Sequence, residues 1–594
     1  MGRSIVETGG GAGLRRPLLA RARDIGVVDA GEWSLGIVAG VVALFILLLM
    51  AIVVWMSTLP GLPGDPGFTL ENYADVFEDG VIFDALINSF LIGIGTVAVN
   101  IVFAVPLAWL VHRTDMRGKS LVVTLVAISI LIPGFLKAMG WILMLSPDIG
   151  LLNSLYVEIA GAAEAPFTIY GIGGVVFIQG LMLTPAMFFL ISGSMIALDP
   201  ALEEAAQMSG ANRWLTIARV SFPLIRPAVI AGLIYNFMTA VTLYEIAALL
   251  LDEDTAVLST ELFLYVRSAG GSIELGYAAV YGVIMMAFAI FALWFYGRAI
   301  RKAHRFAVVT GKGYRPGLVD LGRWRWAAVG FVAFYVALSE LLPLAMLVWM
   351  SLLPALTQFS VSALGAISFA TYGGLWGQLG GWEPLVNTIV MITATPALVV
   401  GFSLVMSYVT VRSRLPGRQL IDTAAMLPHV IPGIAFAFAL IVFGIALSRF
   451  TGLQLSGTMA MIVAALVVYR IPYCTRVTNA ALLQIHAEIE EAARMCGANT
   501  IQILLRIAVP LIKSSLAYAA LWIALLVLRE VTIPLMLASP SNIVLSVRIW
   551  TLWETGQYGA ASALGVVMFT VSGAVLLIVQ RVFRAQGLFE TRSN

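Results

Sequence analysis

The chain has 594 residues, of which 60% are hydrophobic and 11% are charged, and its formal net charge is +2. Soluble proteins carry about 25% charged residues, so this composition excludes an ordinary soluble domain and favours a polytopic membrane protein. Two cysteines, Cys474 and Cys496, are too few for a disulfide framework or a cysteine-built metal site, and the four histidines show no metal-ligand spacing.

The N-terminal residues 1–33 carry five arginines and precede an apolar run at 34–56. A cleaved signal peptide would have a shorter core and a small-residue cleavage site, so we expect an uncleaved first span after a cytosolic tail. Apolar runs predict twelve transmembrane helices in all. The first six lie at 34–56, 86–111, 120–145, 173–197, 228–251 and 277–298, and the second six at 327–352, 386–411, 420–447, 458–483, 516–538 and 560–582.

The distribution of positive charge predicts the orientation. Twelve spans place both termini on one side, and 28 of the 35 Lys and Arg residues lie in segments on that side. By the positive-inside rule these segments face the cytosol, so the sequence predicts a multi-pass protein of the bacterial cytoplasmic membrane with both termini cytosolic.

Two polar loops interrupt the apolar runs at equivalent places. The first polar loop, residues 199–226, returns as the second polar loop, residues 486–513, and 12 of 23 residues match between Glu203 and Ile225 at an offset of 287. Earlier in each half the offset is 299, and an Ile-Pro-Gly sequence ending at Gly134 matches one ending at Gly433. The chain is therefore a tandem duplication.

Each polar loop reads Glu-Ala-Ala, three residues, Gly, and then Pro thirteen residues later. This pattern resembles the EAA loop of permease subunits of ABC importers, and the resemblance covers nearly the whole chain. It implies that each loop folds as two short cytosolic helices, the first of which docks in a groove of an ATPase subunit. The residues implied in this coupling are Glu203, Glu204, Ala205, Ala206, Gly210, Arg219 and Pro223, with Glu490, Glu491, Ala492, Ala493, Gly497, Arg506 and Pro510 in the second copy.

The fold implied by this resemblance is an all-α polytopic membrane protein of the type I ABC importer permease class. Its two six-helix bundles are parallel repeats. The expected domains are a tail at 1–33, a permease domain at 34–300, a linker at 301–325, a second permease domain at 326–585 and a tail at 586–594.

No catalytic constellation accompanies the loops, so we expect a transport subunit rather than an enzyme. Gly118-Lys119-Ser120 is similar to the end of a P-loop, but Arg113 stands where that motif needs Gly. We therefore expect no cofactor in this chain, with ATP and Mg²⁺ bound by a partner. The expected partners are two copies of an ABC ATPase subunit, an extracytoplasmic substrate-binding protein and the lipid bilayer, but no nucleic acid.

Charged residues inside the predicted spans are costly and become functional candidates. They are Lys137, Glu245, Arg470, Arg529 and Glu530. Two interpretations stay open: they pair with one another between helices, or they line the translocation path.

Within the superfamily, the fused halves and the Leu528-Arg529-Glu530 stretch resemble ferric-iron-type permeases. Relatives of the same layout handle thiamine, 2-aminoethylphosphonate or polyamines. A twelve-helix secondary transporter is the alternative from another class, although it would not need the repeated loop.

Overall fold

We analysed a computed structural model of the chain, which describes residues 29–162, 164–196, 198, 200–268, 272–303, 318–354, 365–429 and 431–585. Residues 1–28 of the N-terminal tail, most of the linker and the C-terminal tail named above lie outside these residues. The described part is all-helical apart from one isolated bridge between Thr114 and Val319. It contains 11 helices long and apolar enough to cross a membrane, and a bent pair raises the number to 12. The expected fold class is confirmed.

The first half contains six spans by this measure. They are α1 (Ala30–Met56), α3 (Val81–Arg113), the bent pair α4 (Lys119–Ser129) and α5 (Gly134–Leu145), α7 (Ile172–Ile196), the run Ile217–Thr242 that contains α10 (Phe222–Thr242), and α13 (Ser272–Ala303). The bent pair turns by 94° at its break, just before Pro133 and Gly134. Because Pro cannot donate a backbone hydrogen bond, the Ile-Pro-Gly sequence ends α4 and lets α5 leave in a new direction.

The second half repeats this order. Its spans are the run Gly322–Ser351, which contains α14 (Arg325–Val336) and α15 (Leu342–Ser351), then α18 (Glu383–Arg412), α20 (Gly433–Thr451), α21 (Met459–Leu483), the run Thr500–Leu528 that contains α24 (Val509–Leu528), and α27 (Tyr558–Ala585). The short α19 (Arg418–Met426) precedes α20 as α4 precedes α5.

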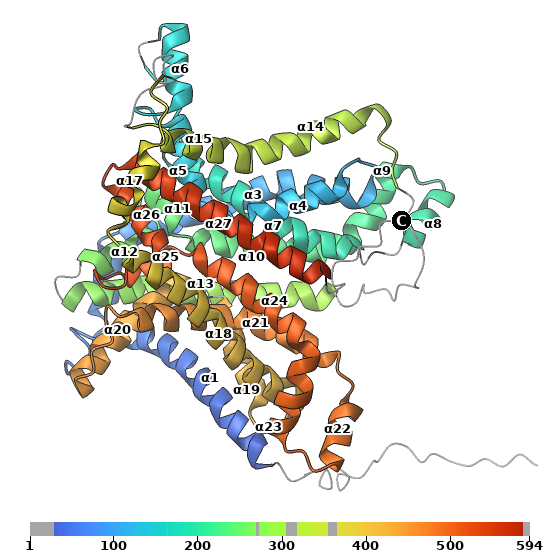
Figure 1. The fold of residues 1–594 in the computed structure, drawn as a ribbon, viewed down its shortest axis with the longest axis vertical. Coiled ribbons are helices and arrows are strands. Elements are labelled where there is room, and N and C mark those ends of the chain that lie inside the picture. Colours follow the sequence, from blue (N-terminus) through green and yellow to red (C-terminus); the bar gives the residue numbers. More distant parts are fainter. Residues whose placement is uncertain are drawn as a thin grey trace, which may run out of the picture.

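The connection after the third span differs between the halves, as the fall in offset from 299 to 287 predicts. In the first half it contains an additional helix, α6 (Leu151–Ala160). In Figure 1, α6 projects beyond the end of α15 at the side of the molecule away from α8 and α9.

The first helix of each half packs on the opposite half. Helix α1 lies against α18, α19 and α20, and α15 lies against α5 as well as α27. Figure 1 shows α1 beside α18 and α19, and α14 with α15 along the far edge of the first half, near α3. The two halves are therefore interlocked by exchanged helices.

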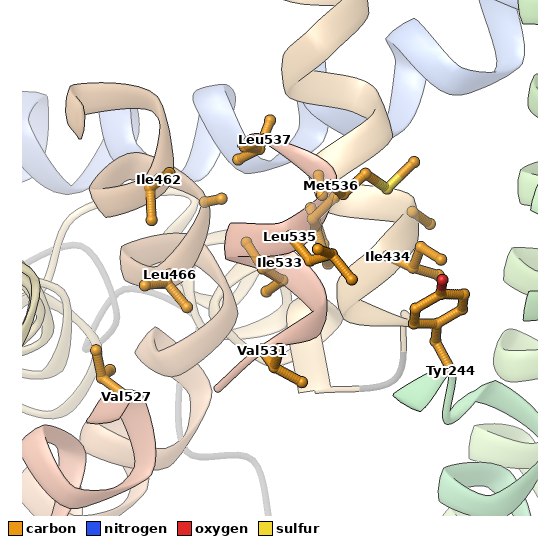
Figure 2. Close-up of a cluster of buried hydrophobic side chains, with 14 of the residues drawn as sticks. Tyr244, Ile434, Ile462, Leu466, Val527, Val531, Ile533, Leu535, Met536 and Leu537 are labelled. Carbon is orange, nitrogen blue, oxygen red and sulfur yellow. The ribbon is translucent and has the colours of Figure 1, made fainter. Parts of the chain in front are cut away.

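Two predicted spans, 228–251 and 516–538, are not continuous helices. Helix α10 ends at Thr242 and is followed by α11 (Glu245–Leu250), while α24 ends at Leu528 and is followed by α25 (Thr532–Met536). Figure 2 shows Ile533, Leu535 and Met536 of α25 among Ile462 and Leu466, with Ile434 facing Tyr244 of the first half. The short helices are buried in protein, which is where interrupted backbone can exist at membrane depth.

Candidate functional site: two attached polar loops and a charged break between the halves

Both polar loops fold as a pair of short helices around a glycine turn. The first contains α8 (Pro200–Met208) and α9 (Arg213–Thr216), and the second contains α22 (Ala487–Met495) and α23 (Thr500–Ile503). Gly210 and Gly497 have φ values of 85° and 84°. The amides of Ala211 and Ala498 donate to the carbonyls of Ala206 and Ala493, at 3.0 and 3.1 Å. These are helix-ending turns of the Schellman kind, in which glycine takes the left-handed position at no steric cost.

The shared asparagines begin the second short helices. Asn212 Oδ1 accepts from the amide of Leu215 at 2.8 Å, and Asn499 Oδ1 accepts from that of Gln502 at 2.9 Å. The amide of Asn499 in turn donates to Gln502 Oε1 at 3.1 Å, which completes a capping box. The repeated sequence therefore encodes, in both loops, the same end of the first short helix, the same glycine turn and the same start of the second short helix.

A π-helical turn joins each second helix to the membrane span. These turns are Ile217–Ser221 and Leu504–Ala508, at equal positions in the two copies. They contain the predicted Arg219 and Arg506, whose side chains are exposed, and the exposed Pro223 and Pro510 follow in the span. Such turns are rare and frequently occur at functional sites.

Glu490 lies at the inner face of its loop rather than at its surface. Only 4% of the residue is exposed, its carboxylate lies 3.1 Å from Arg412 Nε, and Tyr408 Oη donates to it at 3.4 Å. Arg412 also donates to the carbonyls of Leu482 and Ile485, both at 2.7 Å. Arg412 therefore joins the second polar loop to the C-terminal ends of α18 and α21.

The first polar loop repeats this attachment. Arg113 Nε lies 3.7 Å from Glu203, Arg113 donates to the carbonyl of Met195 at 3.0 Å, and Ser221 Oγ donates to Glu203 at 2.7 Å. The arginines match at the offset of 299 and the carbonyls of Met195 and Leu482 at the offset of 287. The match of the two arginines is visible in the sequence, but sequence reasoning had not assigned them to this site.

The other predicted loop residues lie toward the surface. Glu491, Ala205 and Ala492 are exposed, and Glu204, Ala206 and Ala493 are half-buried. A hollow of about 340 Å³ between the short helices of the first loop is lined by Ala206, Gly210 and Arg219, among others. Sequence reasoning did not single out Met208 and Met495, which are 90% and 88% exposed.

Four of the charged residues predicted inside spans come together where the halves meet. Arg470 donates to Glu530 at 2.6 Å, and Thr532 Oγ1 donates to Glu245 at 3.1 Å across the interface. The charges of Arg470, Arg529 and Glu530 all act on Glu245. Glu245 begins α11 and Glu530 precedes α25, so the cluster is placed at both helix breaks. The sequence led us to expect both glutamates inside continuous spans, but the helices are interrupted at these positions.

Lys137 makes a separate contact between the halves. Its Nζ donates to Ser129 Oγ at 2.9 Å, to the carbonyl of Ser129 at 3.2 Å and to Ser339 Oγ at 3.5 Å. The charge of Glu340, which is 5% exposed, acts on Lys137. Sequence reasoning missed Glu340, although a carboxylate inside the apolar run 327–352 was a visible signal.

Comparisons with known proteins match this duplicated arrangement. The profile of the family described as "Binding-protein-dependent transport system inner membrane component" matches residues 80–305 and 385–586. Each matched segment contains one polar loop, so both copies of the repeat carry the features of the family.

Several curated proteins are similar over most of their length. The chain is 24% identical to the ferric transport system permease protein FbpB of Actinobacillus pleuropneumoniae, over 86% of this chain and 72% of that protein. It is 25% identical to the putative ferric transport system permease protein FbpB 1 of Haemophilus influenzae, over 74% of this chain and 67% of that protein. The Fe(3+)-transport system permease protein FbpB 2 of the same organism is 22% identical, over 80% of this chain and 85% of that protein.

Proposed function

Because this chain belongs to the family of binding-protein-dependent transport system inner membrane components, we propose that its two polar loops each dock on one ATPase subunit. The chain is a multi-pass inner-membrane permease of an ABC importer and not a catalytic subunit. Membership implies an ATPase and a binding protein as partners. ATP and Mg²⁺ would bind to the ATPase, and one copy of this chain would serve two ATPase subunits.

The observation that carries this proposal is the repeated attachment of the loops. In each half an arginine at the end of the second span binds both the loop glutamate and the last carbonyls of the fourth span. A force applied to a loop therefore reaches two membrane helices through buried, charge-assisted contacts. An ordinary connector between spans would need neither the attachment nor its repetition.

Met208 and Met495 supply the docking surface in this proposal. Each occupies the last position of the first short helix and is almost fully exposed, at 90% and 88%. Exposed apolar side chains on a helix suit insertion into a partner's hydrophobic groove, and methionine adapts to irregular gaps. The orientation that this requires places both loops and both termini in the cytosol, in agreement with the positive charge.

We further propose that the charged break between the halves lines the translocation path. Arg470, Arg529, Glu530 and Glu245 lie where two helices from different halves are interrupted, and Lys137 lies on α5 beyond the Pro133 bend. Ionisable groups at membrane depth are retained mainly at pathways or in pairs, and this cluster includes groups from both halves.

Ferric iron is the proposed substrate, delivered by an external binding protein. The support is that three similar permeases carry ferric or Fe(3+) transport in their names. Thiamine, 2-aminoethylphosphonate and polyamines are the alternatives. Uptake of radiolabelled ferric iron, measured against competition by each alternative, separates these substrates.

Substituting the exposed methionines tests ATPase docking. Met208→Asp and Met495→Asp place a charge in the proposed groove, so each should reduce ATPase co-purification and uptake, and the double variant should abolish both. Met208→Leu and Met495→Leu are the matched controls, since they keep an apolar side chain of similar size. Full co-purification of an ATPase by the double aspartate variant, at a normal membrane level, would show that the loops are not the docking sites.

A further inference from the structure

The start of α1 is bound to the second polar loop, although the two are more than 450 residues apart in sequence. Asp29 Oδ2 accepts from the amide and from the hydroxyl of Thr500, both at 2.8 Å, and Asp29 Oδ1 accepts from the amide of Glu32 at 2.6 Å. One carboxylate therefore caps the first turn of α1 and the first turn of α23. A Cβ placed on Gly31 would lie 3.2 Å from Ile501 Cγ1, so the two helix starts are in close contact.

A second contact holds the start of α1. The amide of Arg414, in the connection between α18 and α19, donates to Glu32 Oε1 at 2.8 Å. Burial opposes ionisation of Asp29, but the hydrogen bonds from Thr500 and Glu32 and the charge of Arg494 outweigh it and lower the pKa. The carboxylate is therefore ionised at neutral pH, which is the form that accepts these bonds most strongly.

The sequence around Asp29 is itself repeated. Val28-Asp29-Ala30-Gly31-Glu32-Trp33 matches Val319-Asp320-Leu321-Gly322-Arg323-Trp324 at four of six positions. The second copy uses its carboxylate within its own turn, since Asp320 accepts from the amide of Gly322 at 2.8 Å and lies 3.7 Å from Arg325.

The segment around Asp320 is attached to the connection between α3 and α4 and not to the first polar loop. Asp115, in the connection between α3 and α4, accepts from the amide of Leu321 at 3.0 Å and pairs with Arg325. Among the described atoms of 318–325, no hydrogen bond or ion pair reaches α9. The same motif thus binds a polar loop at one start and not at the other.

We propose that Asp29 positions the second polar loop by fixing the start of α23 to a helix that belongs to the first half. This rests on the proposed coupling function of the loops. Movement delivered to the second loop would then reach both halves, through Arg412 and through α1, whereas the first loop is held by Arg113 of its own half. The two polar loops would therefore transmit movement from their ATPase subunits to different sets of membrane helices, despite the duplication.

A set of combined variants tests whether Asp29 acts through the second loop. Asp29→Ala, Asp29→Asn and the control Asp320→Ala are placed in the unaltered chain, in Gly210→Ala and in Gly497→Ala. Asp29→Ala should lower uptake per inserted chain by roughly 3- to 10-fold, the size expected for losing a helix cap, in the unaltered and Gly210→Ala chains. It should add little in Gly497→Ala, Asp29→Asn should restore part of the uptake, and Asp320→Ala should have no effect. An equal loss in all three backgrounds would mean that Asp29 only stabilises α1, and the proposal would be wrong.

A crosslink tests the contact independently of transport. With Cys496→Ser to remove a nearby exposed thiol, the pair Gly31→Cys and Ile501→Cys should form a disulfide in membranes under mild oxidation. Asp29→Ala should slow its formation several-fold, and Asp320→Ala should not. Failure to crosslink, or a rate that ignores Asp29, would overturn the proposed attachment. A crosslink that depends on Asp29, together with unimpaired uptake in the Gly210→Val and Gly497→Val double variant, would instead leave the attachment standing and remove the coupling function.

Discussion

Arg113 and Arg412 show how one residue type at one position can define a site. Each lies at the end of a long span and binds a loop glutamate, half-buried at Glu203 and buried at Glu490, and a carbonyl at the end of a second span. The resemblance implies Glu203 and Glu490 in coupling to an ATPase, and their carboxylates face inward, toward these arginines. The sequence contained the repeated arginines, but pairing them with the glutamates requires knowing that both chain segments reach the same depth.

At the charged break, Glu245 and Glu530 have different expected roles. Glu530 is paired with Arg470, and both side chains are largely buried, with 14% and 16% exposed. Removing one partner of a buried pair costs about 3–5 kcal/mol, so Glu530→Ala should lower the melting temperature and the amount of folded protein. Glu245→Gln keeps an acceptor for Thr532 and removes only charge, so it should lower uptake while leaving the melting temperature nearly unchanged.

Both quantities should be measured on the purified complex and in vesicles. Glu530→Gln is the intermediate control, since it keeps a hydrogen-bonding group opposite Arg470. Normal uptake by Glu245→Gln would contradict a role for this carboxylate on the path. The cluster would then be a set of structural pairs, which is the other interpretation that the sequence leaves open.

At the scale of helices, the repeats predict which elements exist but not where they break. The runs 228–251 and 516–538 are predominantly apolar, yet helices end at Thr242 and Leu528 inside them. Hydropathy reports the polarity of side chains and not the course of the backbone. Most residues of α11 and α25 are apolar because these short helices are buried in protein, so hydropathy does not reveal the breaks before them. The spans also begin at Ile217 and Thr500, well before the predicted 228 and 516, because their first turns extend into the polar loops.

The glycine turns of the loops are a case in which sequence and structure agree. Gly210 and Gly497 adopt left-handed φ values, and a Cβ at either would meet nothing within 4 Å. Any effect of substitution must therefore come from backbone strain and not from a clash. Gly210→Val and Gly497→Val should each strain the turn by about 1–3 kcal/mol, lower substrate-stimulated ATP hydrolysis and uptake, and leave insertion intact.

The double valine variant should be more impaired than either single variant, because each loop engages its own ATPase subunit in the proposed assembly. Gly210→Asn and Gly497→Asn are the matched controls, since asparagine enters the left-handed region more readily than other side chains. They should retain most of the activity. Equal impairment by asparagine and valine would mean that strain in the turn is not the cause.

At the scale of the whole molecule, the exchanged first helices are the feature that the sequence did not reveal. The repeat defines two six-helix halves, but α1 packs on α18 and α20, and α15 packs on α5. Lipid tails are as apolar as the side chains of a span, so hydropathy does not indicate which neighbour a span will choose. Close packing identifies the neighbour. Gly140 of α5 lies so near Pro343 of α15 that a Cβ at position 140 would be 2.6 Å from the Pro343 Cα.

The exchange predicts that the halves hold together without a covalent link. If the chain is cut between Gly311 and Lys312 and the two parts are co-expressed, they should co-purify and support uptake. The reason is that α1 buries Ala39, Ile46 and Leu49 almost completely against its neighbours, an interface that does not involve the cut. Removing residues 1–57 from the first part should weaken co-purification, because α18 and α20 would lose the helix that covers them while α15 still packs on α5.

Two glycines, one in each exchanged interface, provide a graded test of the same arrangement. A methyl group at Gly140 meets the backbone of Pro343, which cannot move aside, so Gly140→Ala should weaken co-purification of the parts by about 1–3 kcal/mol. A methyl group at Gly36 of α1 meets only the end of the Leu415 side chain, at 2.5 Å, and a flexible side chain can rotate away. Gly36→Ala should therefore leave co-purification unchanged. If the cut parts are each stable but never associate, the linker and not the exchanged helices unites the halves, and the interlocked arrangement is wrong.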